Sequence, residues 1–302
     1  MRVSTSMIFD GLTDKLATNA ADMAQLQAQI STGNKYVNPS EAAGIVGRVQ
    51  AIEGRLKTLE ADATAIKRVK VGVEAQARAL ELAANVMNRL KEIAFQGAND
   101  PQPKAVLDQL AEEVAGIKRA LVDLANTRDS EDRHVFAGTR SGERPYTLNA
   151  DGSVSYVGAT SPLRVRVSNT NYEDAAVPGT EVWKSIKRGN DSVDMFTALT
   201  EYEDALRSGA PGGRTQALQD VEAMVANLGI ATARVGSSQS RLETSELQAD
   251  ETTIRAQSSL ADLKELDFAA ALAQLQKQEL LMQASQSLLG RLSQLSLLET
   301  LR

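Results

Sequence analysis

The sequence contains no cysteine, so disulfide bonds, thiolate nucleophiles and cysteine-based zinc sites are excluded. Aromatic residues are also scarce, at 4% of the 302 residues, which is few for a compact core and favours elongated helical packing. The longest purely apolar run, residues 268–273, is far shorter than the ~18 residues that a membrane-spanning helix needs. We therefore expect no membrane insertion. The first residues lack the apolar stretch of a cleaved signal peptide, so we expect none.

Basic residues do not dominate either. The 33 Lys and Arg residues face 39 Asp and Glu residues, for a net charge of −6, which argues against nucleic-acid binding. The single histidine, His134, would alone have to support a catalytic triad or a histidine metal site. The motifs of serine hydrolases, zinc proteases and nucleotide-binding loops are missing from the sequence. We expect no catalytic residue, no cofactor and no metal site, and we interpret His134 as a structural or an exposed histidine.

Apolar residues recur at alternating steps of four and three between Ile45 and Met87, interrupted only by Lys70. A mean spacing of about 3.5 residues is typical of a helix that lies along partner helices in a left-handed supercoil. One apolar stripe cannot offset the conformational entropy of so long a helix, so the helix needs partners. Matching stripes occur at residues 107–124 and 218–242, which predicts an antiparallel helical bundle.

A turn is predicted between the first helix, residues 1–32, and the long helix, which we expect from residue 40 to about residue 96. Gly33 is placed to end the first helix in a left-handed conformation. Asn38 is a candidate N-cap, followed by Pro39 at the first helical position and by a glutamate that reaches back to the cap. The predicted junction residues are Gly33, Asn38, Pro39, Ser40 and Glu41.

In the middle of the chain the helical pattern gives way to short β-like segments. Asp100-Pro101 opens a third predicted helix, and after residue 126 short β-like segments replace the helical pattern. Asp151-Gly152 predicts a two-residue hairpin turn in which both residues need positive φ. From Asp191 the helical pattern returns, with one break at residues 209–213. The β-like segments are His134–Phe136, Tyr146–Leu148, Val154–Val157 and Leu163–Val167.

These patterns predict a mainly α fold. A long antiparallel helical bundle or coiled coil forms from the N- and C-terminal halves, and a small β-rich insertion lies in the middle. We expect three domains. Residues 1–40 with 263–302 form a terminal helical assembly domain, residues 41–136 with 190–262 form the long bundle, and residues 137–189 form an outer β-rich insertion.

Both ends of the chain carry apolar residues at helical spacing. In one interpretation they form a terminal helical hairpin that covers the core of the monomer. In the other, each end is incompletely buried in the monomer and buries its apolar stripe against neighbouring subunits on assembly. The candidate assembly-interface residues are Leu12, Leu16, Met23, Leu26, Ile30, Leu275, Met282, Leu289, Leu292 and Leu295.

Several stretches carry a family resemblance through their order along the chain. They are MRVSTSMIFDGL at the start, QISTGNK at 29–35 with NPSEAAG at 38–44, LANTRD at 124–129 running into VFAG at 135–138, NDSVDMFTAL at 190–199, and LDFAAA at 266–271 with QLSLL at 294–298. Together these stretches resemble the flagellin-like proteins of bacterial flagella, over about two-thirds of the chain. The segment before the β-rich insertion is similar to that of family members at the junction between hook and filament.

The resemblance implies a structural, non-enzymatic subunit of the bacterial flagellum that joins hook to filament as a homo-oligomeric ring. It implies export in an unfolded state by the flagellar type III apparatus, with an export chaperone and without a cleaved signal peptide. Folding would then accompany assembly through the terminal helices, outside the cell, next to a neighbouring hook-associated protein and flagellin. Two alternatives stay open, a flagellin that forms the filament itself and an intracellular coiled-coil scaffold.

Overall fold

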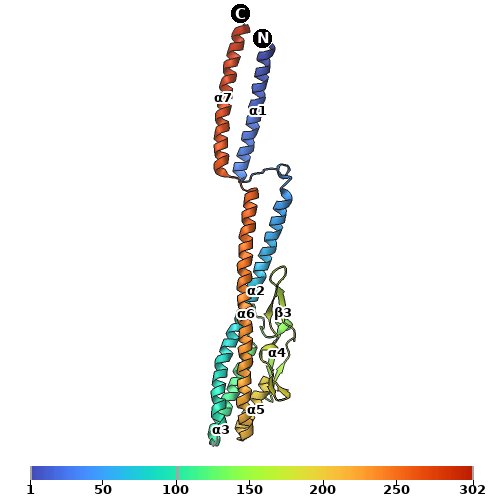
Figure 1. Ribbon diagram of the computed structural model, residues 1–302, viewed down its shortest axis with the longest axis vertical. Helices are drawn as coiled ribbons and strands as arrows, with labels where there is room; N and C mark the ends of the chain where they lie inside the picture. Colours follow the sequence, from blue (N-terminus) through green and yellow to red (C-terminus); the bar gives the residue numbers. More distant parts are fainter. Residues whose placement is uncertain (1, 100–101, 301–302) are drawn as a thin grey trace. The chain divides into compact units, whose positions relative to one another are not determined.

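The computed structural model describes residues 2–99 and 102–300. It is mainly helical, with two-stranded antiparallel sheets in the middle of the chain, which confirms the predicted fold class (Figure 1). The helices are α1 (Arg2–Thr32), η1 (Pro39–Ala42), α2 (Val46–Ala98), α3 (Lys104–Ala125), η2 (Gly138–Arg140), α4 (Gly179–Val182), α5 (Met195–Ser208), α6 (Pro211–Lys264) and α7 (Phe268–Thr300). The strands are β1 (Tyr146–Leu148), β2 (Val154–Tyr156), β3 (Leu163–Arg166), β4 (Tyr172–Ala176), β5 (Ile186–Arg188) and β6 (Asp191–Val193).

The chain forms two compact units. The first unit comprises Met1–Thr58 and Thr252–Arg302, and the second comprises Leu59–Glu251. The long helices α2 and α6 contribute residues to both units. The predicted division into three domains stays a prediction.

In the first unit, α1 and α7 run antiparallel and side by side (Figure 1). The beginning of α1 and the end of α7 therefore lie at the same end of this helix pair. The predicted first helix is confirmed, because α1 ends at Thr32 and Gly33 follows it with a φ of 70°.

The core of the second unit is formed by apolar residues of α2, α3, α5 and α6 together with residues of the β-rich segment. The predicted stripe of α2 supplies buried residues such as Val73, Leu80 and Met87. An aromatic cluster completes the core. Phe136 packs edge-on against Trp183 with ring centroids 5.7 Å apart, and Trp183 in turn lies 6.4 Å from Phe196.

The start of the long helix differs from the prediction. Instead of beginning at residue 40, α2 begins at Val46, because Asn38 and Pro39 start only the single 3-10 turn η1. The third helix, α3, begins at Lys104, whereas the residues predicted to open it, Asp100-Pro101, lie outside the described residues.

The helix break at residues 209–213 is confirmed. α5 ends at Gly209, which adopts a φ of 75° and donates its N–H to Leu206 O, and α6 begins at Pro211. Beyond this break, α6 runs as one helix to Lys264.

The β-rich segment was predicted only in part. β1 and β2 pair as predicted, but the Asp151-Gly152 turn is a three-residue loop, because Asn149 N–H donates to Ser153 O and only Gly152 has positive φ there. His134–Phe136 is a buried turn rather than a strand. Strands β4, β5 and β6 were not predicted, and β6 (Asp191–Val193) lies where a helix was expected.

Gly72 brings strand β4 into direct contact with helix α2. A Cβ atom at this position would lie 2.5 Å from the backbone oxygen of Ala175. The same oxygen accepts a hydrogen bond of 3.3 Å from Gln76 Nε2, one turn further along α2. The absence of a side chain at Gly72 therefore fixes the distance between the sheet and the helix.

We expect Gly72→Ala to destabilise the second unit by about 1–3 kcal/mol, because β4 must shift and the Gln76 hydrogen bond lengthens. Gly116→Ala in α3 is the matched control. No described atom lies within 4 Å of its added Cβ, so it should stabilise by about 0.5–1 kcal/mol through helix propensity alone. Urea denaturation followed by the fluorescence of Trp183, the only tryptophan, measures both. Equal changes in the free energy of unfolding for the two substitutions would contradict the close approach of β4 to α2 at Gly72.

Candidate functional site

The predicted interface residues of α1 lie on one face of the helix. Leu12, Leu16, Met23 and Ile30 are half-buried and Leu26 is buried. With Asn19 they follow the alternating four- and three-residue spacing of a coiled-coil seam. Since α1 packs against α7, this face is used within the chain.

The predicted residues of α7 lie on the matching face. Leu275, Met282 and Leu289 are half-buried, in one seam with the buried Ala271. Polar residues interrupt this seam, and the buried Oε1 atom of Gln278 has no hydrogen-bond partner in the described chain. The side chains of Leu292 and Leu295 lie outside the described residues. The structure thus brings the described interface candidates together as one intramolecular seam, and their role in assembly stays a prediction.

Other apolar residues of α7 face away from that seam. Leu280 is 67% exposed and Leu288 is 52% exposed. At 100° per residue the exposed side chains lie on several sides of the helix, outside the seam with α1. None of these exposed residues is among the interface candidates predicted from the sequence. The exposed set is Phe268, Leu272, Leu280, Leu281 and Leu288.

The two chain segments that enter and leave the α1–α7 pair are joined by backbone hydrogen bonds. Lys35 N–H donates to Lys264 O at 2.8 Å, and Leu266 N–H donates to Gly33 O at 2.9 Å. Between them, Asn34 and Glu265 form an antiparallel bridge. The turn after α1 and the turn after α6 therefore form a short two-stranded ladder within the first unit.

The predicted junction residues lie beside this ladder. Gly33 N–H donates to Gln29 O at 2.8 Å and ends α1 as expected. Asn38 is the N-cap of η1 with Pro39 in its first turn, although in the described chain the Asn38 side chain makes no capping hydrogen bond. Ser40 is exposed, and the side chains of Pro39 and Glu41 lie outside the described residues.

A groove of about 380 Å³ follows the junction on the first unit. Its lining is largely apolar, and the exposed Tyr36 and Val37 form part of it. The ion pair between Lys264 and Glu53, 3.0 Å long, lies at its side. Sequence reasoning did not identify this groove.

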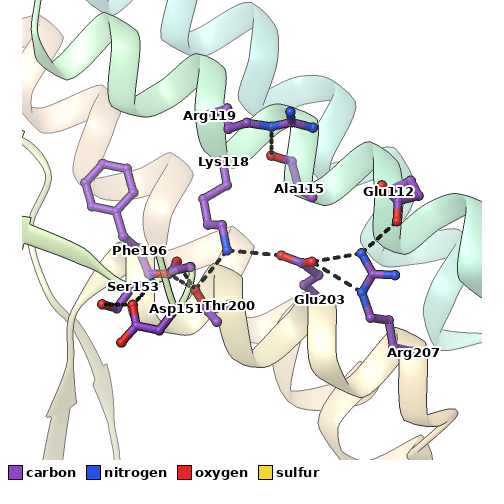
Figure 2. Close-up of polar contacts among 11 residues, drawn as sticks. Glu112, Ala115, Lys118, Arg119, Asp151, Ser153, Phe196, Thr200, Glu203 and Arg207 are labelled. Atoms are coloured by element: carbon purple, nitrogen blue, oxygen red, sulfur yellow. Dashed lines mark hydrogen bonds and ion pairs between the residues drawn. The ribbon is translucent and has the colours of Figure 1, made fainter. Parts of the chain in front are cut away.

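An ion-pair network, buried at Lys118, partly buried at Glu203 and exposed at Arg207 and Glu112, joins helices α3 and α5 in the second unit (Figure 2). Lys118 Nζ on α3 donates to Glu203 Oε2 at 3.0 Å and to Thr200 Oγ1 at 3.1 Å, both on α5. Arg207 donates to Glu203 Oε1 and to Glu112 Oε1, at 3.0 and 2.8 Å. Burial opposes ionisation of Glu203, yet the hydrogen bonds from Lys118 and Arg207 lower its pKa.

The network also reaches the β1–β2 loop. Thr200 Oγ1 lies 3.0 Å from Phe196 O on its own helix and 3.5 Å from Gly152 O in the loop, and it can donate its one proton to either. A Cβ on Gly152 would lie 3.8 Å from Lys118 Nζ. With both charges paired and Lys118 only 5% exposed, the arrangement is suited to fixing the hairpin on the helices rather than to proton transfer.

A polar groove of about 600 Å³ lies between β3–β4 and α6. Its arginines are already paired, Arg241 with Glu173 at 2.7 Å and Arg164 with Asp174 at 3.2 Å. The groove therefore offers no excess charge to hold a phosphate.

Within residues 2–99 and 102–300, no group of three His, Asp or Glu side chains is arranged to hold a metal ion. In the same described part, no helix is long and apolar enough to cross a membrane. His134 is buried, and its Nδ1 lies 2.8 Å from Asn126 O.

Two family models match the chain. The bacterial flagellin N-terminal helical region matches residues 3–141, and the bacterial flagellin C-terminal helical region matches residues 215–301. Together they cover both ends of the chain, including the α1–α7 pair and the junction.

Curated relatives match over nearly their whole length. Flagellar hook-associated protein 3 of Salmonella typhimurium is 22% identical, over 94% of this chain and 95% of its own. The protein of the same name from Escherichia coli is 22% identical, over 99% of each chain. The flagellin of Bacillus subtilis is 21% identical, over 97% of each.

Solved structures share the fold. Flagellar hook-associated protein-3 from Legionella pneumophila superposes with a TM-score of 0.65 at 14% identity, over 71% of this chain and 98% of its own. Xanthomonas campestris FlgL superposes with a TM-score of 0.62 at 15% identity, over 70% of this chain and 99% of its own.

Proposed function

The chain belongs to the bacterial flagellin family, and from this premise we propose that it is the structural subunit that joins the flagellar hook to the filament. The two relatives named hook-associated protein 3 match 94% and 99% of the chain and support this role. Membership of a family of structural flagellar proteins also supports the expectation of no enzymatic activity.

The observation that carries the proposal is the exposed apolar surface of α7. Side chains such as Leu272, Leu280 and Leu288 are exposed in the single chain and would be buried by neighbouring subunits, because a large apolar surface is stable only when covered. The seam between α1 and α7 is interrupted by polar residues, so the pair gains further stability from such neighbours. We propose that the terminal helices are completed by assembly.

The same proposal includes the finer roles that the family suggests. The subunit would form a homo-oligomeric ring outside the cell, between a hook-associated protein and flagellin. It would be exported unfolded, with an export chaperone and without a cleaved signal peptide. The absence of cysteine is compatible with this route, because no disulfide has to be formed or broken during export.

A second candidate is a flagellin that forms the filament itself. It is favoured by the Bacillus subtilis flagellin, which matches 97% of the chain. Both candidates use the exposed α7 surface for assembly. They differ in where the subunit is found along the flagellum.

Gold-labelled antibody against the protein, viewed on intact cells by electron microscopy, separates the candidates. We expect label only where hook meets filament, and cells that lack the protein should keep their hooks and lose their filaments. Label along the whole filament would assign the chain as a flagellin. Label confined to the cell interior would contradict both flagellar roles.

A further inference from the structure

The single histidine occupies a site that accepts only its neutral form. His134 is 3% exposed, and its Nδ1 lies 2.8 Å from the backbone oxygen of Asn126. Because a carbonyl oxygen can only accept, Nδ1 carries the proton. The other ring nitrogen, Nε2, is buried and has no hydrogen-bond partner in the described chain. A proton added at Nε2 would therefore be buried without an acceptor.

The surroundings of the ring as a whole lower the pKa of His134 and so also favour its neutral form. Burial is the largest effect and lowers the pKa of His134 below its ordinary value of 6.5, whereas the hydrogen bond to Asn126 raises it. Of the nearby charged groups, Arg128 and Arg144 lower the pKa further and Asp132 raises it. The positive charge of a protonated ring would thus lie near two guanidinium groups.

Asn126, which accepts the hydrogen bond from His134, also holds strand β1 in place. The side chain of Asn126 donates to Tyr146 O at 2.9 Å and accepts from Tyr146 N–H at 2.9 Å. The backbone N–H of His134 donates to Ser141 O at 2.7 Å. These bonds close the loop between α3 and β1 on itself, with His134 at its centre.

The same loop contributes to the core of the second unit. Phe136, two residues after His134, is fully buried and packs against Trp183. Val135 N–H donates to Thr127 O at 3.1 Å, and Val135 O accepts from Val177 N–H at 3.0 Å. Movement of the imidazole out of its site would loosen this packing and both hydrogen bonds.

We propose that His134 is an acid-sensitive switch that holds the loop of residues 127–145 closed while its ring is neutral and releases the loop when the ring is protonated. In the open loop the imidazole reaches water and titrates near 6.5. In the closed loop it resists protonation. Acid therefore favours the open form. The ratio of open to closed loop should rise about fivefold from pH 6.5 to 5.5 and approach a tenfold rise per pH unit below that, until the closed form itself is protonated.

Amide hydrogen exchange on the full-length protein tests the switch. After correction for the pH dependence of intrinsic exchange, protection of peptides within residues 127–145 should fall about fivefold between pH 6.5 and 5.5. Peptides of α3 (Lys104–Ala125) should keep their protection over the same range. A parallel loss in both regions would mean general acid unfolding and would overturn the proposal.

His134→Asn provides the matched control, because its side-chain amide can donate to Asn126 O as Nδ1 does but does not titrate in this range. In this variant, protection of the loop should not change between pH 6.5 and 5.5. An unchanged pH dependence would overturn the proposal.

A measurement on the unaltered protein does not depend on the variant folding. Since His134 is the only histidine, its Cε1–H resonance can be followed by NMR without overlap from others. In the closed loop it should titrate below 6.5. A midpoint at or above 6.5 would contradict a site that excludes the charged ring.

Discussion

Replacing Leu281 and Leu288 together by aspartate is expected to abolish incorporation of the protein into flagella while leaving its helices formed. Both side chains are about half exposed, at 46% and 52%, so the single chain loses little buried contact. In an assembly that covers α7, each carboxylate would be buried without a partner, at a cost of several kcal/mol. Complementation of a strain that lacks the protein, with immunogold microscopy and circular dichroism of the purified variant, measures both effects.

Gln283→Asp with Gln286→Asp is the matched control. These positions on α7 are exposed and already polar, so the same added charge should leave assembly largely intact. Normal assembly of the Leu281 and Leu288 variant would show that this face of α7 is not an interface. Loss of helicity in the purified variant would instead place the two leucines in the core of the monomer.

The helices could be predicted because their periodicity is local information. The alternating spacing between Ile45 and Met87 requires one continuous helix, and Gly33 and Gly209 adopt the left-handed conformation that ends α1 and α5. The start of α2 was misplaced because Asn38 and Pro39 are suited to starting any helical turn. Nothing local distinguishes the 3-10 turn η1 from the first turn of a long helix.

Strands β4, β5 and β6 could not be predicted because their stability comes from distant contacts. Strand β4 (Tyr172–Ala176) shows little alternation, and it is held by Gln76 and by Arg241, which bonds to Glu173. Strand β5 (Ile186–Arg188) is held to α6 by Arg188, which donates to Asp220 at 2.6 Å. Contacts separated by tens of residues leave no pattern within the strand itself.

The candidate interface was predictable only as a set of apolar residues. On a helix as rich in leucine as α7, spacing alone does not distinguish the side that faces α1 from the sides left open. The structure places Leu275 and Met282 in the seam and leaves Leu281 and Leu288 outside it. The division between intramolecular and intermolecular faces thus depends on where α1 packs.

Glu203→Ala is expected to destabilise the second unit by about 3–5 kcal/mol, because it leaves the buried amine of Lys118 without its counter-charge. The side chain of Lys118 is 6% exposed, and without Glu203 the hydroxyl of Thr200 would remain as its hydrogen-bond partner (Figure 2). Loss of the network should also loosen the β1–β2 loop, which Thr200 contacts through Gly152. Urea denaturation followed by Trp183 fluorescence gives the free energy of unfolding.

Glu112→Ala is the control within the same network. Its carboxylate accepts from Arg207 but is exposed, and pairs of this kind contribute about 0–1 kcal/mol. The variant should therefore remain close to the unaltered protein. Similar losses for Glu203→Ala and Glu112→Ala would mean that Lys118 reaches water when Glu203 is removed, and that it does not need this carboxylate as a partner.

The double variant Lys118→Met with Glu203→Ala tests whether the ion pair adds net stability or mainly fixes the arrangement of the helices around it. Removing both charges leaves no uncompensated charge in the core, so the double variant should recover most of the stability that Glu203→Ala loses. If it does, the pair contributes little net stability, and its role is to fix α3, α5 and the hairpin in one arrangement. If the double variant is as unstable as Glu203→Ala, the loss comes from packing around Glu203, and the charge of Lys118 is not its cause.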